Sequence, residues 1–154
     1  MISSIQHPVH LPATRVAAVH VEIPVTDIAP FMDAAIHELL STVQASGVPI
    51  TGDLLSYHRR RPTDTFDCEV AIPIGASIEP QGRVREITLP AAAFVSVTLT
   101  GPYEELPQAW AAFTVAVRNA GLVTDDVFLE RYSRDNTPDT DPATYQTFLY
   151  KRLA

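Results

Sequence analysis

Apolar and polar residues along the first half of the chain follow the periods of a strand, a helix and two further strands. The segment TRVAAVHVEIP, residues 14–24, alternates between apolar and polar positions as a half-buried strand does. Apolar residues then recur at helical spacing over residues 28–43. Thr26 or Asp27 can cap this helix, and Gly47 can end it. The runs DLLSYHRR and FDCEVAIPI predict two strands, which completes a β-α-β-β unit.

The second half of the chain shows the same order of elements. REITLPAAAFVSVTLT, residues 85–100, is extended, and GPYEELPQAWAAFTVAVRNAG carries apolar residues along one helical face as far as Gly121. DVFLERYSRD and TYQTFLYKRL then predict two strands around a polar loop. Gly47 and Gly121 lie 74 residues apart (121 minus 47), and a repeat of this length indicates two similar halves of one domain.

These elements predict an α+β fold of duplicated β-α-β-β units with pseudo-twofold symmetry, antiparallel sheets and two main helices. Each unit has one helix-covered sheet face, and pairing the units leaves a central ligand groove between them. Residues 1–12, rich in His and Pro, are expected to form an irregular N-terminal segment. Residues 13–154 then form a single domain with halves of about 13–76 and 83–154.

Charge and cysteine usage exclude several classes of protein. The 154 residues carry 11 Lys and Arg against 18 Asp and Glu, and the net charge of -7 repels phosphate backbones and anionic lipids. We therefore expect no direct nucleic-acid partner and no membrane association. A signal-like N-terminus and a run of about 18 apolar residues are both missing from the sequence, which favours a cytoplasmic protein. Cys68 is the only cysteine, and its apolar strand neighbours predict a buried, inert thiol.

Sequence motifs for most kinds of catalysis are missing as well. The five histidines lie at positions 7, 10, 20, 37 and 58 with no helical i, i+4 pair, so we expect no metal and no other cofactor. The sequence has no phosphate-cradling glycine loop, no GxSxG elbow and no recognisable Cys/His dyad. Any enzymatic activity would have to be acid-base chemistry in the groove.

The stretch FLERYSRD places a carboxylate between two aromatic rings on one face of a predicted strand. Alternation puts Phe128, Glu130 and Tyr132 on the same side. A lone strand glutamate is commonly exposed to solvent, because Glu is seldom fully buried unless it is paired. The two rings favour the alternative, in which this face lines the groove.

Five segments of the chain resemble the GyrI-like small-molecule-binding domains, which are also the effector-binding domains of AraC-type and MerR-type regulators. The segments are LPAAAFVSVTLTGPYEEL, GVPITG, FDCEVAIPI, the ERY at residues 130–132, and TFLYKRL. The resemblance implies two fused SHS2-like β-α-β-β halves and a groove that often receives flat, aromatic or cationic compounds. It also implies that a groove glutamate meets the ligand, and Glu130 stands at that position here.

The resemblance also bears on the size of the protein. Regulators of this family carry a separate DNA-binding region, and 154 residues leave no room for one beside the double unit. We therefore expect a stand-alone member. Its oligomeric state stays open between monomer and homodimer.

Several further residues are candidates for the groove. Trp110 shares a helical stripe with Leu106 and Phe113, so both a core and a groove position are open to it. Tyr103 belongs first to the turn before the second helix and is a secondary candidate. The predicted ligand-binding residues are, in full, Glu130, Tyr132, Phe128, Trp110, Tyr103, Glu69, His20, Ser56 and His58.

The last four of these residues lie in the first half of the chain. Ser56 and His58 fall at the repeat positions of Glu130 and Tyr132, which predicts an asymmetric groove with its acid on one wall. Glu69 and His20 lie on the faces of their strands opposite the apolar residues, and either solvent or the groove fits them.

Three functions fit this set of residues. The first is a stand-alone protein that captures a planar aromatic or cationic, toxic compound, with Glu130 as counter-charge and the aromatic residues as walls. The second, taken from the resemblance, is a cofactor-independent hydrolase that opens the cyclopropane of DNA-alkylating cyclopropanoid natural products, for self-resistance or detoxification. Its catalytic residues would be Glu130, Tyr132 and Trp110, since a desolvated carboxyl can exchange a proton near neutral pH. The third is a gyrase-inhibitor-type protein interaction.

Overall fold

A single antiparallel sheet of eight strands runs through the computed structural model, which describes residues 1–24, 26 and 28–154. The strands are β1 (Gln6–Leu11), β2 (Thr14–Pro24), β3 (Leu55–His58), β4 (Thr65–Pro73), β5 (Arg85–Leu89), β6 (Ala92–Thr100), β7 (Thr124–Tyr132) and β8 (Gln146–Leu153). Their order across the sheet is β1-β6-β8-β7-β3-β4-β2-β5. The predicted α+β class with antiparallel pairing is therefore confirmed.

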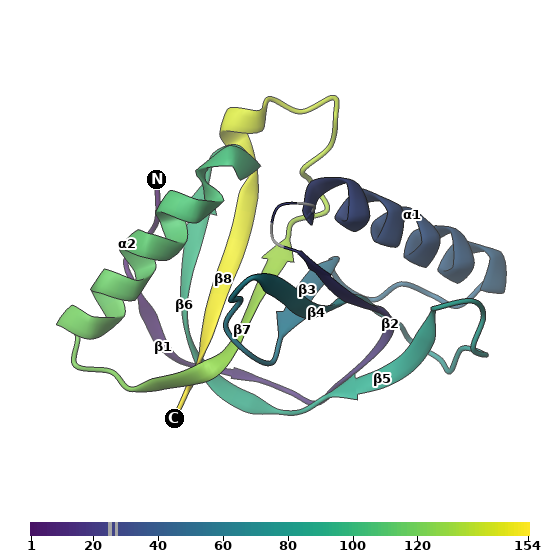
Figure 1. The fold of residues 1–154 in the computed structure, drawn as a ribbon, viewed down its shortest axis with the longest axis horizontal. Helices are drawn as coiled ribbons and strands as arrows, with labels where there is room; N and C mark the ends of the chain where they lie inside the picture. The colour runs from purple at the N-terminus through teal and green to yellow at the C-terminus, as the bar shows by residue number, and fades with distance from the viewer. Residues whose placement is uncertain (25, 27) are drawn as a thin grey trace.

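Two helices, α1 (Ile28–Ser46) and α2 (Leu106–Asn119), cover separate parts of one face of this sheet (Figure 1). Apolar residues of α1 pack on β2 and β4, and those of α2 pack on β6 and β8. Short 3₁₀ turns also lie at Tyr103–Glu105 and Pro142–Thr144. Both predicted helices end at a glycine with positive φ, +74° at Gly47 and +71° at Gly121, a conformation that other residues adopt at a cost.

The sheet joins the two predicted halves at its centre. β2, β3 and β4 form one side, β6, β7 and β8 form the other, and β3 pairs with β7 between them. Each side follows the order strand, helix, strand, strand along the chain. The internal duplication of sequence and its pseudo-twofold symmetry stay predictions.

The opposite face of the sheet carries no helix in the described part of the chain, yet it contains its own apolar cluster. Valine, alanine, leucine and aromatic residues of seven strands meet there, including Tyr57, Phe94, Leu129 and Tyr150. The rings of Phe94 and Tyr150 pack edge to face at 5.9 Å. This arrangement leaves the space beside the helices, rather than the bare face, for a ligand groove.

Three expectations about the fold need comment. Residues 1–12 are not irregular, because Gln6–Leu11 form β1 and pair with β6, where Val9 and Leu11 contact the apolar cluster of the bare face. The extended run 85–100 is two strands that pair with different neighbours, since β5 lies beside β2 and β6 beside β8. The predicted helix cap at Thr26 or Asp27 involves a residue outside the described part of the chain.

No helix among the described residues is both long and apolar enough to span a membrane. Cys68 is fully buried and unbonded, as predicted, and burial raises the pKa of its thiol to about 12. The thiol is therefore protonated and unreactive at neutral pH.

Candidate functional site

A groove of about 890 Å³ lies between the two helices, with the middle of the sheet as its floor. α1 supplies Met32 and Ile36 to one wall, and α2 supplies Leu106 and Trp110 to the other. The floor comes from β3, β4 and β7, and β8 contributes at one end. The floor residues are Ser56, His58, Phe66, Cys68, Phe128, Glu130, Tyr132 and Lys151. Most of these side chains are apolar or aromatic, so the few charged ones stand out.

The register between β3 and β7 explains how the floor is assembled. Ser56 lies opposite Glu130, and His58 lies opposite Phe128. Side chains alternate along each strand, so these four point into the groove while Tyr57 and its neighbours point to the bare face. Two segments more than 70 residues apart in the sequence thereby share one surface.

Glu130 is held in place by two donors from different elements. The indole Nε1 of Trp110 donates to Oε2 at 2.5 Å, and the hydroxyl of Tyr132 donates to Oε1 at 2.6 Å. Among the residues that the structure describes, no Lys, Arg or His nitrogen forms an ion pair with this carboxylate. Burial raises the pKa of Glu130, and the two hydrogen bonds offset only part of that rise.

A chain of polar contacts continues from Glu130 along the floor. The Tyr132 hydroxyl lies 3.1 Å from Ser56 Oγ, which in turn lies 3.2 Å from Nε2 of His58. Burial, with the charge of Glu130 adding to it, raises the pKa of Tyr132 well above its usual value. Burial lowers the pKa of His58 to about 4, and nearby Asp67 opposes this only in part. Both residues are therefore neutral at pH 7.

His58 also holds an aromatic surface together. Its ring stacks on Phe128 at 4.3 Å, with 9° between the planes. Trp110 packs edge-on against the same Phe128 at 5.1 Å, and Tyr103 packs edge-on against Tyr132 at 5.8 Å. The groove thus offers several ring surfaces close to one carboxyl group. Such a surface is suited to flat ligands, because ring pairs favour offset or edge contacts.

The comparison with protein-family models decides the family. The model described as the GyrI-like small molecule binding domain matches residues 8–153. This chain belongs to the GyrI-like family. No match was found among curated proteins.

Solved structures with the same fold as this GyrI-like domain are distant in sequence. The EcmrR C-terminal domain is 18% identical with a TM-score of 0.80, and the match covers 100% of this chain and 97% of that one. The longer EcmrR chain, in a complex with DNA, is matched with a TM-score of 0.78 over 99% of this chain, which spans only 57% of it. At such identity the likeness shows the fold alone.

Two further structural neighbours differ in what is known of them. SAV2435, solved bound to tetraphenylphosphonium, is 13% identical with a TM-score of 0.71, over 98% of this chain and 93% of its own. A protein described as a hydrolase encoded by lin2189 from Listeria innocua is 14% identical with a TM-score of 0.65, over 98% and 92%. The same fold is thus found in a protein with a bound cation and in a protein described as a hydrolase.

Seven of the predicted ligand-binding residues line the groove of this GyrI-like domain. They are Glu130, Tyr132, Phe128, Trp110, Tyr103, Ser56 and His58. Trp110 belongs to both the core and the groove. Its ring packs against the apolar cluster under α2, with the Phe113 ring 5.7 Å away, and it also lines the groove. Tyr103 is more exposed, and its hydroxyl accepts a hydrogen bond from Asn136 at 2.9 Å.

The other two predicted residues, Glu69 and His20, do not line the groove, so that expectation was wrong. On β4 the groove side is taken by Phe66 and Cys68, and Glu69 therefore points to the bare face. There Arg85 donates to both carboxylate oxygens of Glu69, at 3.0 and 2.6 Å, and His20 Nδ1 lies 3.2 Å away. Alternation showed that these residues avoid the α1 core, but only the position of the helices shows which face holds the groove.

Next to Glu69, on the bare face, lies the set of side chains best placed to hold a metal in the described part of the chain. His20, Glu22 and Asp67 each bring one ligand atom, and these atoms lie within 4.8 Å of one another. Glu22 and Asp67 are register partners on β2 and β4. Helical i, i+4 spacing does not indicate this group, because its residues come from two neighbouring strands. All three lie outside the groove.

Sequence reasoning also missed groove residues that no motif marks. Met32, Ile36 and Phe66 line the walls, and their periodicity indicated core alone. Lys151 was missed although a signal existed, because it shares its strand face with the buried Leu149. A lysine on the inward face of a strand departs from the apolar pattern as Glu130 does, and it indicates a groove residue in the same way.

Proposed function

We propose that this GyrI-like domain captures planar aromatic or cationic compounds in its groove, with Glu130 as the counter-charge. The observation that carries the proposal is the state of Glu130, a half-buried carboxyl that has two hydrogen-bond donors and no cationic partner among the described residues. A ligand cation that displaces water from the groove would supply that partner and stabilise the ionised form.

The aromatic residues around Glu130 add to this selectivity. Phe128, Trp110 and Tyr132 present ring faces or edges within the same groove, and each ring facing a desolvated cation contributes about 0.5–2 kcal/mol. The structural neighbour SAV2435, which binds tetraphenylphosphonium, supports the same chemistry. A neutral ligand of equal shape would gain the ring contacts without the charge interaction.

Binding can be followed through Trp110, the only tryptophan of the chain and a direct neighbour of Glu130. Titration with ethidium and with tetraphenylphosphonium should quench its fluorescence, and Glu130→Gln should weaken both affinities about 10- to 100-fold. Asp126→Asn is the matched control, because Asp126 also lines the groove but is 66% exposed and paired with Arg61. Equal affinities for wild type and Glu130→Gln would contradict the proposal.

A second candidate function is hydrolysis of an electrophilic cyclopropane, and the raised pKa of Glu130 is the observation that favours it. A carboxyl whose pKa is raised keeps its proton to higher pH than an exposed one, which suits a general acid. In a cyclopropane fused to a cyclohexadienone, water would form a bond to a ring carbon while a cyclopropane C–C bond breaks and its electrons turn the dienone into a phenolate. Glu130 would protonate the phenolate oxygen, and the proton lost by the attacking water would return to the Glu130 carboxylate. The neighbour described as a hydrolase supports this reading.

The same compounds, followed by mass spectrometry, separate the two functions. Retention of unchanged compound at one equivalent per protein would contradict the hydrolase. Repeated turnover, with a mass gain of one water and its loss in Glu130→Gln, would contradict capture alone.

A further inference from the structure

The chain has one lysine, and it lies in the groove. Lys151 on β8 lines the end of the groove where Thr114, Asp125 and Asp126 also lie. Its ammonium donates to Thr114 Oγ1 at 2.8 Å and lies 5.8 Å from the centre of the Phe113 ring. Because an ammonium has three donors and the described residues accept one, two N–H groups remain for a ligand.

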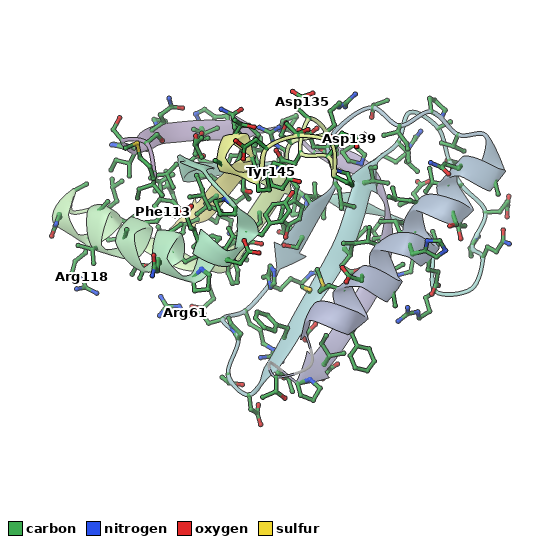
Figure 2. All side chains as sticks on the ribbon, turned by 90° about the horizontal axis from the view of Figure 1, so that it is seen from above. Arg61, Phe113, Arg118, Asp135, Asp139 and Tyr145 are labelled. Carbon is green, nitrogen blue, oxygen red and sulfur yellow. The ribbon has the colours of Figure 1, made fainter. Side chains whose placement is uncertain are left out.

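The two aspartates at this end of the groove are already paired. Arg61 lies 3.3 Å from Asp126, and Arg152 lies 2.7 Å from Asp125. In the described part of the chain Lys151 has no such carboxylate within ion-pair distance. Burial lowers its pKa, and Arg61 and Arg118 lower it further. Figure 2 shows both arginines on the α2 side of the molecule, so this end is locally positive in a protein of net charge -7.

Phe128 is a neighbour of both this positive group and Glu130. Lys151 is the register partner of Phe128 on β7, and Glu130 lies two residues further along that strand. One strand spacing across and two residues along put the Cα atoms of Lys151 and Glu130 about 8 Å apart. The groove floor therefore brings a carboxyl, an aromatic ring and an ammonium together, with Phe128 next to both charged residues, and neither charge has a partner of opposite sign among the described residues.

We propose that the groove selects flat compounds with two polar ends: a cationic or strongly donating group against Glu130 and an anionic group, a carboxylate or phenolate, against Lys151. The inference rests on the proposed function and adds a second specificity residue to it. The aromatic centre of such a ligand would lie on Phe128. An anion at Lys151 would gain two charge-assisted hydrogen bonds in a partly desolvated site, which is where such bonds are strong.

A pair of probes of equal shape tests the inference. The first joins an N-methylpyridinium ring end to end with a benzoate ring, and the second is its methyl ester, which keeps the cation and loses the anion. Affinities are measured by calorimetry for wild type, Lys151→Gln, Lys151→Arg and Glu130→Gln, with thermal unfolding as a check on folding. The ratio of the two affinities is informative because, if Lys151 had a purely structural role, its replacement would weaken the binding of both probes equally.

The expected result is that wild type binds the acid about tenfold more tightly than the ester. Lys151→Gln should remove this preference without changing ester affinity by more than about twofold, and Lys151→Arg should retain most of it. A wild type without preference for the acid, or a Lys151→Gln variant weakened equally for both probes, overturns the inference. Ester binding that ignores Glu130→Gln instead overturns the proposed function, and failure of both probes to bind overturns both.

Discussion

The two faces of the sheet treat the same residue type in opposite ways. Glu69 on the bare face is only 1% exposed, and Arg85 donates a hydrogen bond to each of its carboxylate oxygens. Burial alone would raise the pKa of Glu69, but the bonds from Arg85 and His20 outweigh it and hold the pKa below its usual value. Glu130 on the groove face has only neutral donors among the described residues, and burial raises its pKa.

The contrast extends to the neighbours of each glutamate. In the groove, burial lowers the pKa values of His58 and Lys151 and raises that of Tyr132. All three shifts favour the neutral form of the side chain. On the bare face the hydrogen bond to Glu69 raises the pKa of Arg85, which stays charged. Glu69 on the bare face thus has its counter-charges within the protein, whereas Glu130 and Lys151 on the groove face have none among the described residues. Desolvation without a partner is costly, and natural folds accept that cost mainly where function requires it.

The largest effect expected from this contrast is acid destabilisation through His58. The folded protein holds the pKa of His58 at about 4 against an ordinary 6.5, so between these values the unfolded chain binds a proton that the folded one does not. Stability should therefore fall by about 3 kcal/mol in total as pH falls through this window. Urea denaturation at several pH values should show a shallower decline for His58→Phe. If the unfolding free energies of wild type and His58→Phe fell in parallel with pH, His58 would not be buried in its neutral form.

Glu69→Gln should cost about 2 kcal/mol of unfolding free energy at pH 7, less than a fully buried broken pair, because Arg85 is partly exposed and can be hydrated. The pKa of Glu69 is lowered in the folded state, so its contribution is present above the unfolded value of 4.5 and lost as pH falls through the folded value. Thermal and urea unfolding at pH 7 and pH 3 measure this difference. Ligand affinity should not change, since Glu69 lies outside the groove.

Glu130→Gln should have a smaller effect of opposite sign, stabilising the free protein by about 1 kcal/mol at pH 8. Because the pKa of Glu130 is raised in the folded state, stability falls as pH rises above the unfolded value of 4.5 toward the folded one. Glutamine mimics the protonated acid, with its oxygen accepting from Trp110 and its amide donating to Tyr132. The difference from wild type should vanish near pH 4. Destabilisation by this variant at pH 8 would end the contrast with Glu69.

Much of the fold could be read from periodicity, and part of the groove with it. Alternation placed Phe128, Glu130 and Tyr132 on one face, and the helical stripe identified Trp110 as a residue with two possible surroundings. β1 was missed because its strand is short, polar and exposed along most of its length, so it lacks the alternation that identifies half-buried strands. Glu69 was misplaced because alternation assigns a residue to a face without showing what covers that face.

The sequence by itself determined the helices and their glycine ends, six strand-like runs, the family, and the face of each predicted strand on which a residue lies. The tertiary structure alone decided that β3 pairs with β7, which sets Ser56 against Glu130, and that β8 brings Lys151 to the same floor. Local patterns record which side of an element avoids water. Partners across strands depend on contacts between segments far apart in the chain. Those contacts give Glu69 two arginines and leave Glu130 without a counter-ion among the described residues.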